Sequence, residues 1–200
     1  MIWPTDYVDT IICGDCLEVM RGMPDKSVDA VITDPPYGVD FRGSEWDSFI
    51  PNWLGQARRI SDVVIFTTAP LTLWDYPRPD WVHCWYREAS NSRNLQGGFN
   101  HWSPILMYGK RKFMVDSIKL HAISNSYPRG FPHPSPKPEK LVNWLVENGS
   151  NNGAVILDPF LGSGTTAVAC KNLNRHFIGI EINPDYCKIA EDRLRQGVLI

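Results

Sequence analysis

The chain has 200 residues, of which 43% are hydrophobic, and a formal net charge of −2. This length and apolar content predict one globular domain with a sizeable core, and they exclude a fibrous or disordered chain. No apolar run reaches the roughly 18 residues of a membrane span, and no basic patch followed by an apolar stretch opens the chain. We therefore expect a cytosolic protein without a membrane partner.

Short apolar runs bounded by turn residues alternate with stretches of helical periodicity along the chain. Strands are expected at 10–13, 28–33, 62–68, 81–87, 103–109, 154–158 and 175–181. Helices are expected at 16–22, 50–60, 138–148, 164–173 and 184–196. This alternation is typical of an α/β protein with a mostly parallel sheet covered on both faces. Residues 88–102 and 111–137 lack clear periodicity and are expected to form irregular loops.

The motif Asp34-Pro35-Pro36-Tyr37 directly follows the strand predicted at 28–33. Open α/β sheets bind ligands at the carboxyl ends of their strands. The two prolines stiffen the backbone, lack an N–H and leave carbonyl oxygens free to accept hydrogen bonds. This combination suits a site that grips a flat group carrying an NH₂. An ordinary Pro-Pro turn is the alternative.

A second motif, Asp158-Pro159-Phe160-Leu161-Gly162-Ser163-Gly164-Thr165-Thr166, combines a strand end, a glycine turn and a helix start. Glycines let a ligand approach the backbone, and a helix start offers unpaired N–H donors. Glu181 ends the next predicted strand, 19 residues after Gly162, where it can accept hydrogen bonds from ribose hydroxyls. A glycine turn that binds nothing is the alternative.

The chemistry around this turn favours a particular class of ligand. The complete dinucleotide fingerprint G-x-G-x-x-G is absent, and so is the phosphate-binding loop G-x-x-x-x-G-K-[ST]. Asp158 would place a carboxylate beside any pyrophosphate, which electrostatics disfavours. A ligand with a ribose and an ammonium group fits better, and S-adenosylmethionine is such a ligand.

The five cysteines do not predict a disulfide framework, because their number is odd. The pair Cys13 and Cys16 lacks the second ligand pair of a zinc site and the context of a thioredoxin-like redox motif. We interpret the cysteines as small buried hydrophobic residues and predict no metal site.

Positive charge is concentrated in the middle of the chain. Residues 78–140 contain ten Lys or Arg and four Asp or Glu, a net +6, so the remainder carries −2 − 6 = −8. Such a segment is typical of a polyanion site, although a solvated face has the same composition.

Together these motifs resemble the amino-group DNA methyltransferases, specifically their circularly permuted β group of the D-P-P-Y type. Asp34-Pro35-Pro36-Tyr37 precedes the glycine turn by more than a hundred residues, as the permuted order requires. Residues 13–18 with 24–29, and His133-Pro134 with 137–141, are similar to flanking segments of that family. The resemblance covers 10–37 and 103–195. It implies a single methyltransferase domain over 1–200 with the fold that binds S-adenosylmethionine: a seven-stranded, mostly parallel sheet with one antiparallel strand and helices on both faces.

The resemblance also implies roles for individual residues. Asp34 and the Pro35 carbonyl would accept hydrogen bonds from the target amine, and Tyr37 would stack on the base, with Pro36 completing the catalytic motif. The implied cofactor-binding residues are Asp15, Cys16, Lys137, Asp158, Phe160, Gly162, Ser163, Gly164, Thr165, Thr166, Glu181 and Asn183. Asp15 would contact the adenine, Glu181 the ribose, and Asp158 and Lys137 the methionine end. DNA contacts are expected from loops 38–50, 88–102 and 111–137, including Arg42, Arg87, Arg93, Arg111 and Lys112.

The implied activity is methyl transfer from S-adenosylmethionine to the N6 amine of adenine in double-stranded DNA, on a base flipped out of the duplex. Family members with aspartate first in the motif usually modify adenine, and N4-cytosine modification is the alternative. A C5-cytosine enzyme needs a nucleophilic cysteine, which typically follows a proline in its motif. None of the cysteines in this chain follows a proline, so that class is excluded. An RNA or small-molecule methyltransferase and a catalytically silent binding module are more distant alternatives. The enzyme would act in a prokaryotic cell or a phage-infected host, with a restriction partner or as an orphan, and a homodimer is compatible with the sequence.

Overall fold

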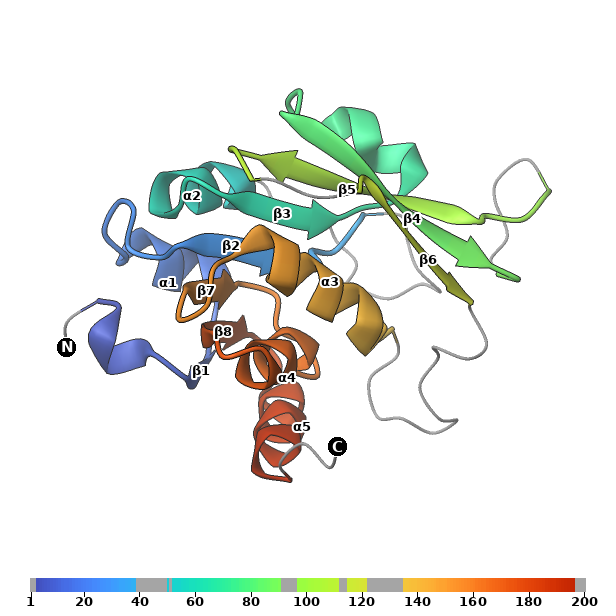
Figure 1. The fold of residues 1–200 in the computed structure, drawn as a ribbon. Coiled ribbons are helices and arrows are strands. Elements are labelled where there is room, and N and C mark those ends of the chain that lie inside the picture. Colours follow the sequence, from blue (N-terminus) through green and yellow to red (C-terminus); the bar gives the residue numbers. More distant parts are fainter. Residues whose placement is uncertain are drawn as a thin grey trace.

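The computed structural model describes residues 3–38, 50, 52–90, 97–111, 115–121 and 135–196. Within this part of the chain, eight strands form one sheet in the order β1-β8-β7-β2-β3-β5-β4-β6 (Figure 1). The strands are β1 Thr10–Cys13, β2 Ala30–Thr33, β3 Val64–Thr67, β4 Trp81–Glu88, β5 Trp102–Tyr108, β6 Ser117–His121, β7 Val155–Asp158 and β8 His176–Glu181. The seven strands predicted from the sequence are all present, with ends shifted by at most two residues.

The predicted mostly parallel sheet with one antiparallel strand is confirmed. β5 runs antiparallel to both of its neighbours, β3 and β4, and the other strand pairs are parallel. The predicted number of seven strands is wrong, because β6 pairs with β4 and adds an eighth. β6 lies inside the segment 111–137 that was expected to be irregular. Its Ile118 and Leu120 pack into the core while the alternate positions are exposed, so a short period-two pattern marks this strand.

Five α-helices occur among the described residues, at the positions expected from the sequence to within three residues. They are α1 Cys16–Arg21, α2 Trp53–Ile60, α3 Glu139–Gly149, α4 Thr165–Asn172 and α5 Pro184–Arg195, with short 3₁₀ turns η1 Thr5–Tyr7 and η4 Pro70–Asp75. Side chains cap two of them: Asp15 accepts from the Glu18 N–H, and Asn183 accepts from the Asp185 N–H. In the described ranges, each helix is too short or too polar to cross a membrane.

The helices cover the sheet from both sides, because successive residues of each strand point to opposite faces. α3, α4 and α5 (orange to red in Figure 1) pack on one face with a core that includes Ile32, Ile156 and Phe177. α1, α2 and the segment after η4 cover the other face, where Val31, Leu157 and the neighbouring helix residues are buried. The burial of both faces explains why the central strands read as continuous apolar runs.

The connections define where a ligand can bind. α2 leads from β2 to β3 on one face of the sheet, whereas α4 leads from β7 to β8 on the other, and β2 and β7 are neighbours. The strand order therefore reverses between β7 and β2. Ligands of open α/β sheets bind outside the carboxyl ends of the strands at this kind of reversal.

Candidate active site

Five adjacent parallel strands end in polar residues at the same edge of the sheet. Asp15 follows β1, Glu181 ends β8, Asp158 ends β7, Asp34 follows β2 and Thr67 ends β3. Because parallel strands share one carboxyl edge, residues far apart in sequence come together here. The catalytic and cofactor motifs predicted from the sequence thus lie at neighbouring strand ends.

Asp34 receives three hydrogen-bond donors. Its Oδ1 accepts from the Tyr37 hydroxyl at 2.7 Å and from the Thr67 hydroxyl, while its Oδ2 accepts from the Lys137 ammonium. The Lys137 Nζ also lies 5.2 Å from the centroid of the Tyr37 ring, within the range of a cation–π contact. The side chain of Lys137 is 13% exposed and that of Asp34 is 31% exposed, so the ion pair is largely shielded from water. Pro35 beside them is buried.

Tyr37 acts as a hydrogen-bond donor in this arrangement. Its hydroxyl lies 3.1 Å from the Thr67 Oγ1 in addition to its contact with Asp34. Burial of the phenol, followed by the neighbouring Asp34 charge, raises the pKa of Tyr37 well above its ordinary value of 10.0. Tyr37 therefore stays protonated at physiological pH and can donate to the Asp34 carboxylate.

Asp158 is a buried carboxylate directly beside the catalytic motif. It is 4% exposed, and its Oδ1 accepts from the Thr33 Oγ1 at 2.5 Å and from the Phe160 N–H at 3.0 Å. Burial raises the pKa of Asp158 to about 6, although hydrogen bonds from Thr166 and Thr33 oppose the shift. Thr33 immediately precedes Asp34, so one short hydrogen bond connects the two motifs.

The raised pKa of Asp158 predicts a specific pH dependence of stability. An unfolded aspartate titrates near 3.8, so between about pH 4 and 6 the native state binds this proton more tightly than the unfolded state does. This contribution to the free energy of unfolding is therefore lost as pH rises through the window, by about 3 kcal/mol in total. Asp158→Asn removes the titration, so the variant should gain about this amount relative to wild type between pH 4 and pH 7. Urea unfolding of both proteins across that range checks the prediction, and parallel pH profiles would contradict it.

Glu181 holds the glycine turn in place. Its Oε2 accepts from the Gly162 N–H at 2.7 Å and its Oε1 accepts from the Asn183 N–H at 2.8 Å. Burial raises the pKa of this carboxyl, and these backbone hydrogen bonds oppose the shift. A carboxylate has about four lone-pair sites, so Glu181 retains capacity to accept from ligand hydroxyls.

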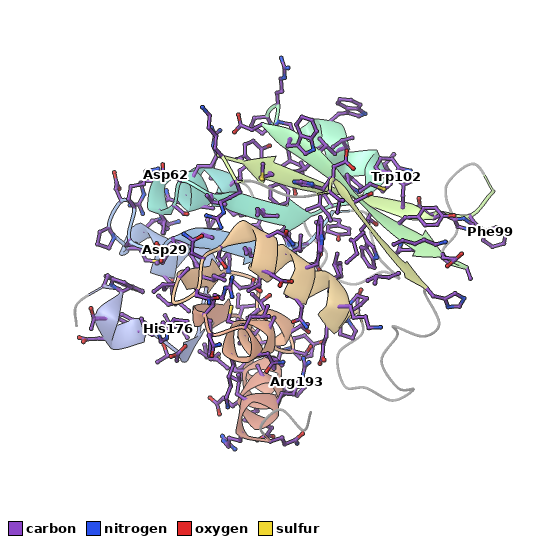
Figure 2. The ribbon with its side chains drawn as sticks, in the orientation of Figure 1. Asp29, Asp62, Phe99, Trp102, His176 and Arg193 are labelled. Atoms are coloured by element: carbon purple, nitrogen blue, oxygen red, sulfur yellow. The ribbon has the colours of Figure 1, made fainter. Side chains whose placement is uncertain are left out.

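The turn itself requires glycine. Gly162 has φ 53° and Gly164 has φ 84°, a backbone region that side chains disfavour, and α4 begins directly afterwards. Arg193 of α5 (labelled in Figure 2) donates to the Ser163 carbonyl at 2.7 Å and to the Thr165 Oγ1 at 3.2 Å. It also forms an ion pair with Glu139 at 2.8 Å. Arg193 thus stabilises the glycine turn through hydrogen bonds from α5. No motif in the sequence predicts this role.

Two further predicted cofactor residues take different positions. Asp15 caps α1, where its Oδ1 accepts from the Glu18 N–H at 2.9 Å, and it lies at the same sheet edge as Glu181. Cys16 points into the apolar core with 6% exposure, and burial raises the pKa of its thiol to about 12. Cys16 therefore contributes packing beneath the strand end. The interpretation of the cysteines as buried hydrophobic residues is correct for Cys16, Cys170 and Cys187, but it is wrong for Cys13, which is exposed at the end of β1, and Cys84 is only half-buried.

Of the five predicted DNA contacts, Arg87 and Arg111 belong to the described residues, and they lie at opposite edges of the sheet. Arg42, Arg93 and Lys112 lie outside the described residues, as do 39–49, 91–96, 112–114 and 122–134 of the predicted loops. Arg87, near the carboxyl end of β4, donates to the Asn100 carbonyl at 3.2 Å and lies over the Trp85 ring. Arg111 follows β5 and donates to Asn151, before β7. Because β5 is antiparallel, Arg111 lies at the opposite edge of the sheet from Asp34.

The fold and the row of strand-end side chains define a methyltransferase of the open α/β type. The family model N6_N4_Mtase, described as DNA methylase, matches residues 74–192, more than half of the chain. The chain belongs to this family of DNA methylases.

Individual relatives agree with this placement. The type II methyltransferase M.HpaI of Haemophilus parainfluenzae is 27% identical over 234 residues, which covers 92% of this chain and 73% of the relative. Among solved structures, the complex of M1.HpyAVI with SAM has a TM-score of 0.70 at 24% identity, covering 92% of this chain and 98% of the other. The PvuII DNA methyltransferase, named as cytosine-N4-specific, has a TM-score of 0.70 at 16% identity and covers 92% and 85%.

Proposed function

We propose that this chain is a permuted, β-group DNA methyltransferase that transfers a methyl group from S-adenosylmethionine to the N6 amine of adenine in double-stranded DNA. The observation that carries the proposal is the contact between the two motifs. Asp34 and Asp158 stand at the ends of neighbouring strands, and the Thr33 hydroxyl donates to Asp158 at 2.5 Å. A target amine at Asp34 and a methyl donor at Asp158 would therefore meet at the point where the strand order reverses.

The residues around the glycine turn fit this cofactor in their chemistry. Three carboxylates, those of Asp15, Asp158 and Glu181, stand at adjacent strand ends. They favour a ligand with cationic groups and ribose hydroxyls, and they disfavour a pyrophosphate. Glu181 would hold the ribose hydroxyls and Asp15 would contact the adenine. Lys137 would pair with the carboxylate of the methionine end.

The remaining cofactor residues shape this position. Gly162 and Gly164 leave the backbone open to close approach, and Ser163, Thr165 and Thr166 are buried around the turn. The Phe160 ring lies edge-on to Trp53 with centroids 5.5 Å apart, which gives the site an apolar wall. Asn183 caps α5 and donates its N–H to Glu181.

The chemistry then follows from the geometry of the catalytic motif. When bound, the cofactor supplies an electrophilic methyl group on a sulfonium. An exocyclic amine is a poor nucleophile because its lone pair is delocalised into the base. Asp34 and the Pro35 carbonyl would accept from the two N–H groups of the amine and so favour a pyramidal nitrogen with a directed lone pair. Stacking on Tyr37 would offset part of the cost of removing the base from the duplex.

The aspartate at the first position of the motif favours adenine, because family members of this type usually modify adenine. N4-cytosine is the second candidate, supported by the fold shared with the PvuII enzyme. We further propose that the chain acts as a single methyltransferase domain in the cytoplasm of a bacterial or phage-infected cell.

Sequencing of genomic DNA tests base and site together. The protein is expressed in a host without endogenous adenine methylation, and the DNA is read by a modification-sensitive method. We expect N6-methyladenine at one short recognition sequence, absent from a matched culture expressing Asp34→Ala. N4-methylcytosine instead would establish the second candidate. The absence of any new methylated base in DNA, with methyl transfer to RNA in vitro, would contradict the proposal.

A further inference from the structure

We propose that Thr67 is a positioning residue for methyl transfer, which anchors Oδ1 of Asp34 so that Oδ2 is the oxygen presented to the target amine. The inference rests on the proposed function and assigns a task to a residue outside the recognised motifs. Thr67 is the last residue of β3, whose neighbour β2 leads into Asp34. It is 1% exposed, so its hydroxyl must find its partners inside the protein.

The partners of Thr67 are the two functional groups of the catalytic motif. Its hydroxyl donates to Oδ1 of Asp34, and its Oγ1 lies 3.1 Å from the Tyr37 hydroxyl. The Tyr37 hydroxyl in turn lies 2.7 Å from the same carboxylate oxygen. Two hydroxyl donors therefore converge on Oδ1 from buried or half-buried positions, and this fixes the rotation of the carboxylate.

The other oxygen of Asp34 has a different kind of partner. Oδ2 accepts from the Lys137 ammonium, at the end of a long side chain whose four rotatable bonds let it withdraw. A target amine can take the place of Lys137 at Oδ2 without breaking either contact at Oδ1. The fold thus gives the two oxygens of Asp34 different roles. Oδ1 is held by hydroxyl groups of the protein, and Oδ2 can exchange its partner for the target amine.

The adjacent Thr68 offers a matched control. Its side chain is equally buried, but its Oγ1 pairs with the Thr72 Oγ1 at 2.9 Å, away from Asp34. Valine has nearly the shape of threonine and lacks the hydroxyl, so the same substitution at both positions removes one hydroxyl from the core each time. A general packing effect would appear in both variants, whereas loss of Asp34 positioning would appear in the Thr67 variant.

The test compares Thr67→Val, Thr67→Ser and Thr68→Val by steady-state kinetics on a DNA substrate, cofactor titration and crystallography. We expect Thr67→Val to lower kcat by roughly 10- to 100-fold, by analogy with the loss that follows removal of groups that orient metal ligands. The KM for DNA and the dissociation constant of the cofactor should stay close to wild type. Serine, which keeps the hydroxyl, should restore most of kcat, and Thr68→Val should leave it unchanged. The crystal structure of Thr67→Val should show a rotated Asp34 carboxylate.

Each contrary result has a distinct meaning. A wild-type kcat in Thr67→Val, or equal losses in all three variants, would overturn the positioning role. An unrotated Asp34 carboxylate in the Thr67→Val crystal would overturn it even without activity data. If the wild-type protein transferred no methyl group to any nucleic acid, the proposed function would fail, and the structural comparison would still decide the role of Thr67.

Discussion

Asp34→Ala is expected to lower kcat for methyl transfer by roughly 10²- to 10³-fold, while the affinity for S-adenosylmethionine stays close to wild type. The reason is that the Asp34 carboxylate would contact the amine itself, and loss of one directly aligned polar group commonly costs roughly 10²- to 10³-fold in kcat. Apart from Lys137, the cofactor contacts lie at the ends of β1, β7 and β8 and on the glycine turn, so they survive the substitution, and Lys137 itself stays in place to pair with the carboxylate of the methionine end. Single-turnover transfer of labelled methyl groups to DNA, with a parallel cofactor titration, measures both quantities.

Two further variants separate catalysis from folding in this experiment. Alanine at position 34 also leaves the ammonium of Lys137, 13% exposed, without its carboxylate partner, which lowers stability. Asp34→Asn keeps the shape of the side chain and should be equally inactive, because the Thr67 and Tyr37 hydroxyls hold the amide oxygen and leave the NH₂, which cannot accept, facing the target amine. Asp75→Ala removes an exposed carboxylate at the end of η4 and should retain full activity. Full methylation activity in the Asp34 variants would show that this residue is not required for methyl transfer and would contradict its assignment as a catalytic residue.

Gly164→Ala is expected to lower the free energy of unfolding by about 3 kcal/mol and to weaken cofactor binding. Two costs combine at this position. With φ 84°, an alanine pays roughly 1 kcal/mol for the left-handed backbone. Its Cβ would also lie 2.7 Å from the Ala190 Cβ and 3.0 Å from the Ala190 Cα, and forcing an atom into a packed core costs about 1–3 kcal/mol. Since backbone atoms of α5 cannot give way, the glycine turn must move.

Gly153→Ala separates the two contributions. Gly153 has a similar left-handed backbone, with φ 73°, but an added Cβ there would meet no neighbouring atom within 4 Å. Its alanine variant should therefore lose only the backbone cost, about 1 kcal/mol. Urea unfolding of both variants gives the difference, which we expect to be about 2 kcal/mol. Equal losses at the two positions would show that α4 and α5 are not in close contact at Gly164.

The sequence predicted much of the architecture because the signals involved are local. The central strands are apolar runs buried on both faces, and each helix has an apolar face packed against one of the two cores. Both patterns can be recognised within short segments of the sequence. β6 was missed because an edge strand of five residues has only Ile118 and Leu120 to bury, and a Pro- and Ser-rich stretch follows it. An edge strand is recognised with certainty only when its partner is known, and here that partner is β4.

The candidate site divides in the same way. Asp34, Tyr37, Asp158, Glu181 and the glycine turn belong to motifs whose spacing can be read directly. Thr67 and Arg193 belong to no motif, since each acts through contacts with residues about 30 positions away. Asp34 and Arg111 lie at opposite edges of the sheet because β5 is antiparallel to β3. The distribution of charge along the sequence gives no information on strand direction.

Apart from β6, the elements, their order and the acidic and glycine motifs at particular strand ends could be predicted from the amino-acid sequence, because backbone propensity and side-chain chemistry are properties of neighbouring residues. The neighbouring positions of the strand ends, the contacts of Asp34 Oδ1 with Thr67 and of Oδ2 with Lys137, and the hydrogen bonds from Arg193 to the glycine turn become visible only in the folded chain. These are consequences of strand order and direction in the sheet, and strand pairing joins segments that are more than a hundred residues apart.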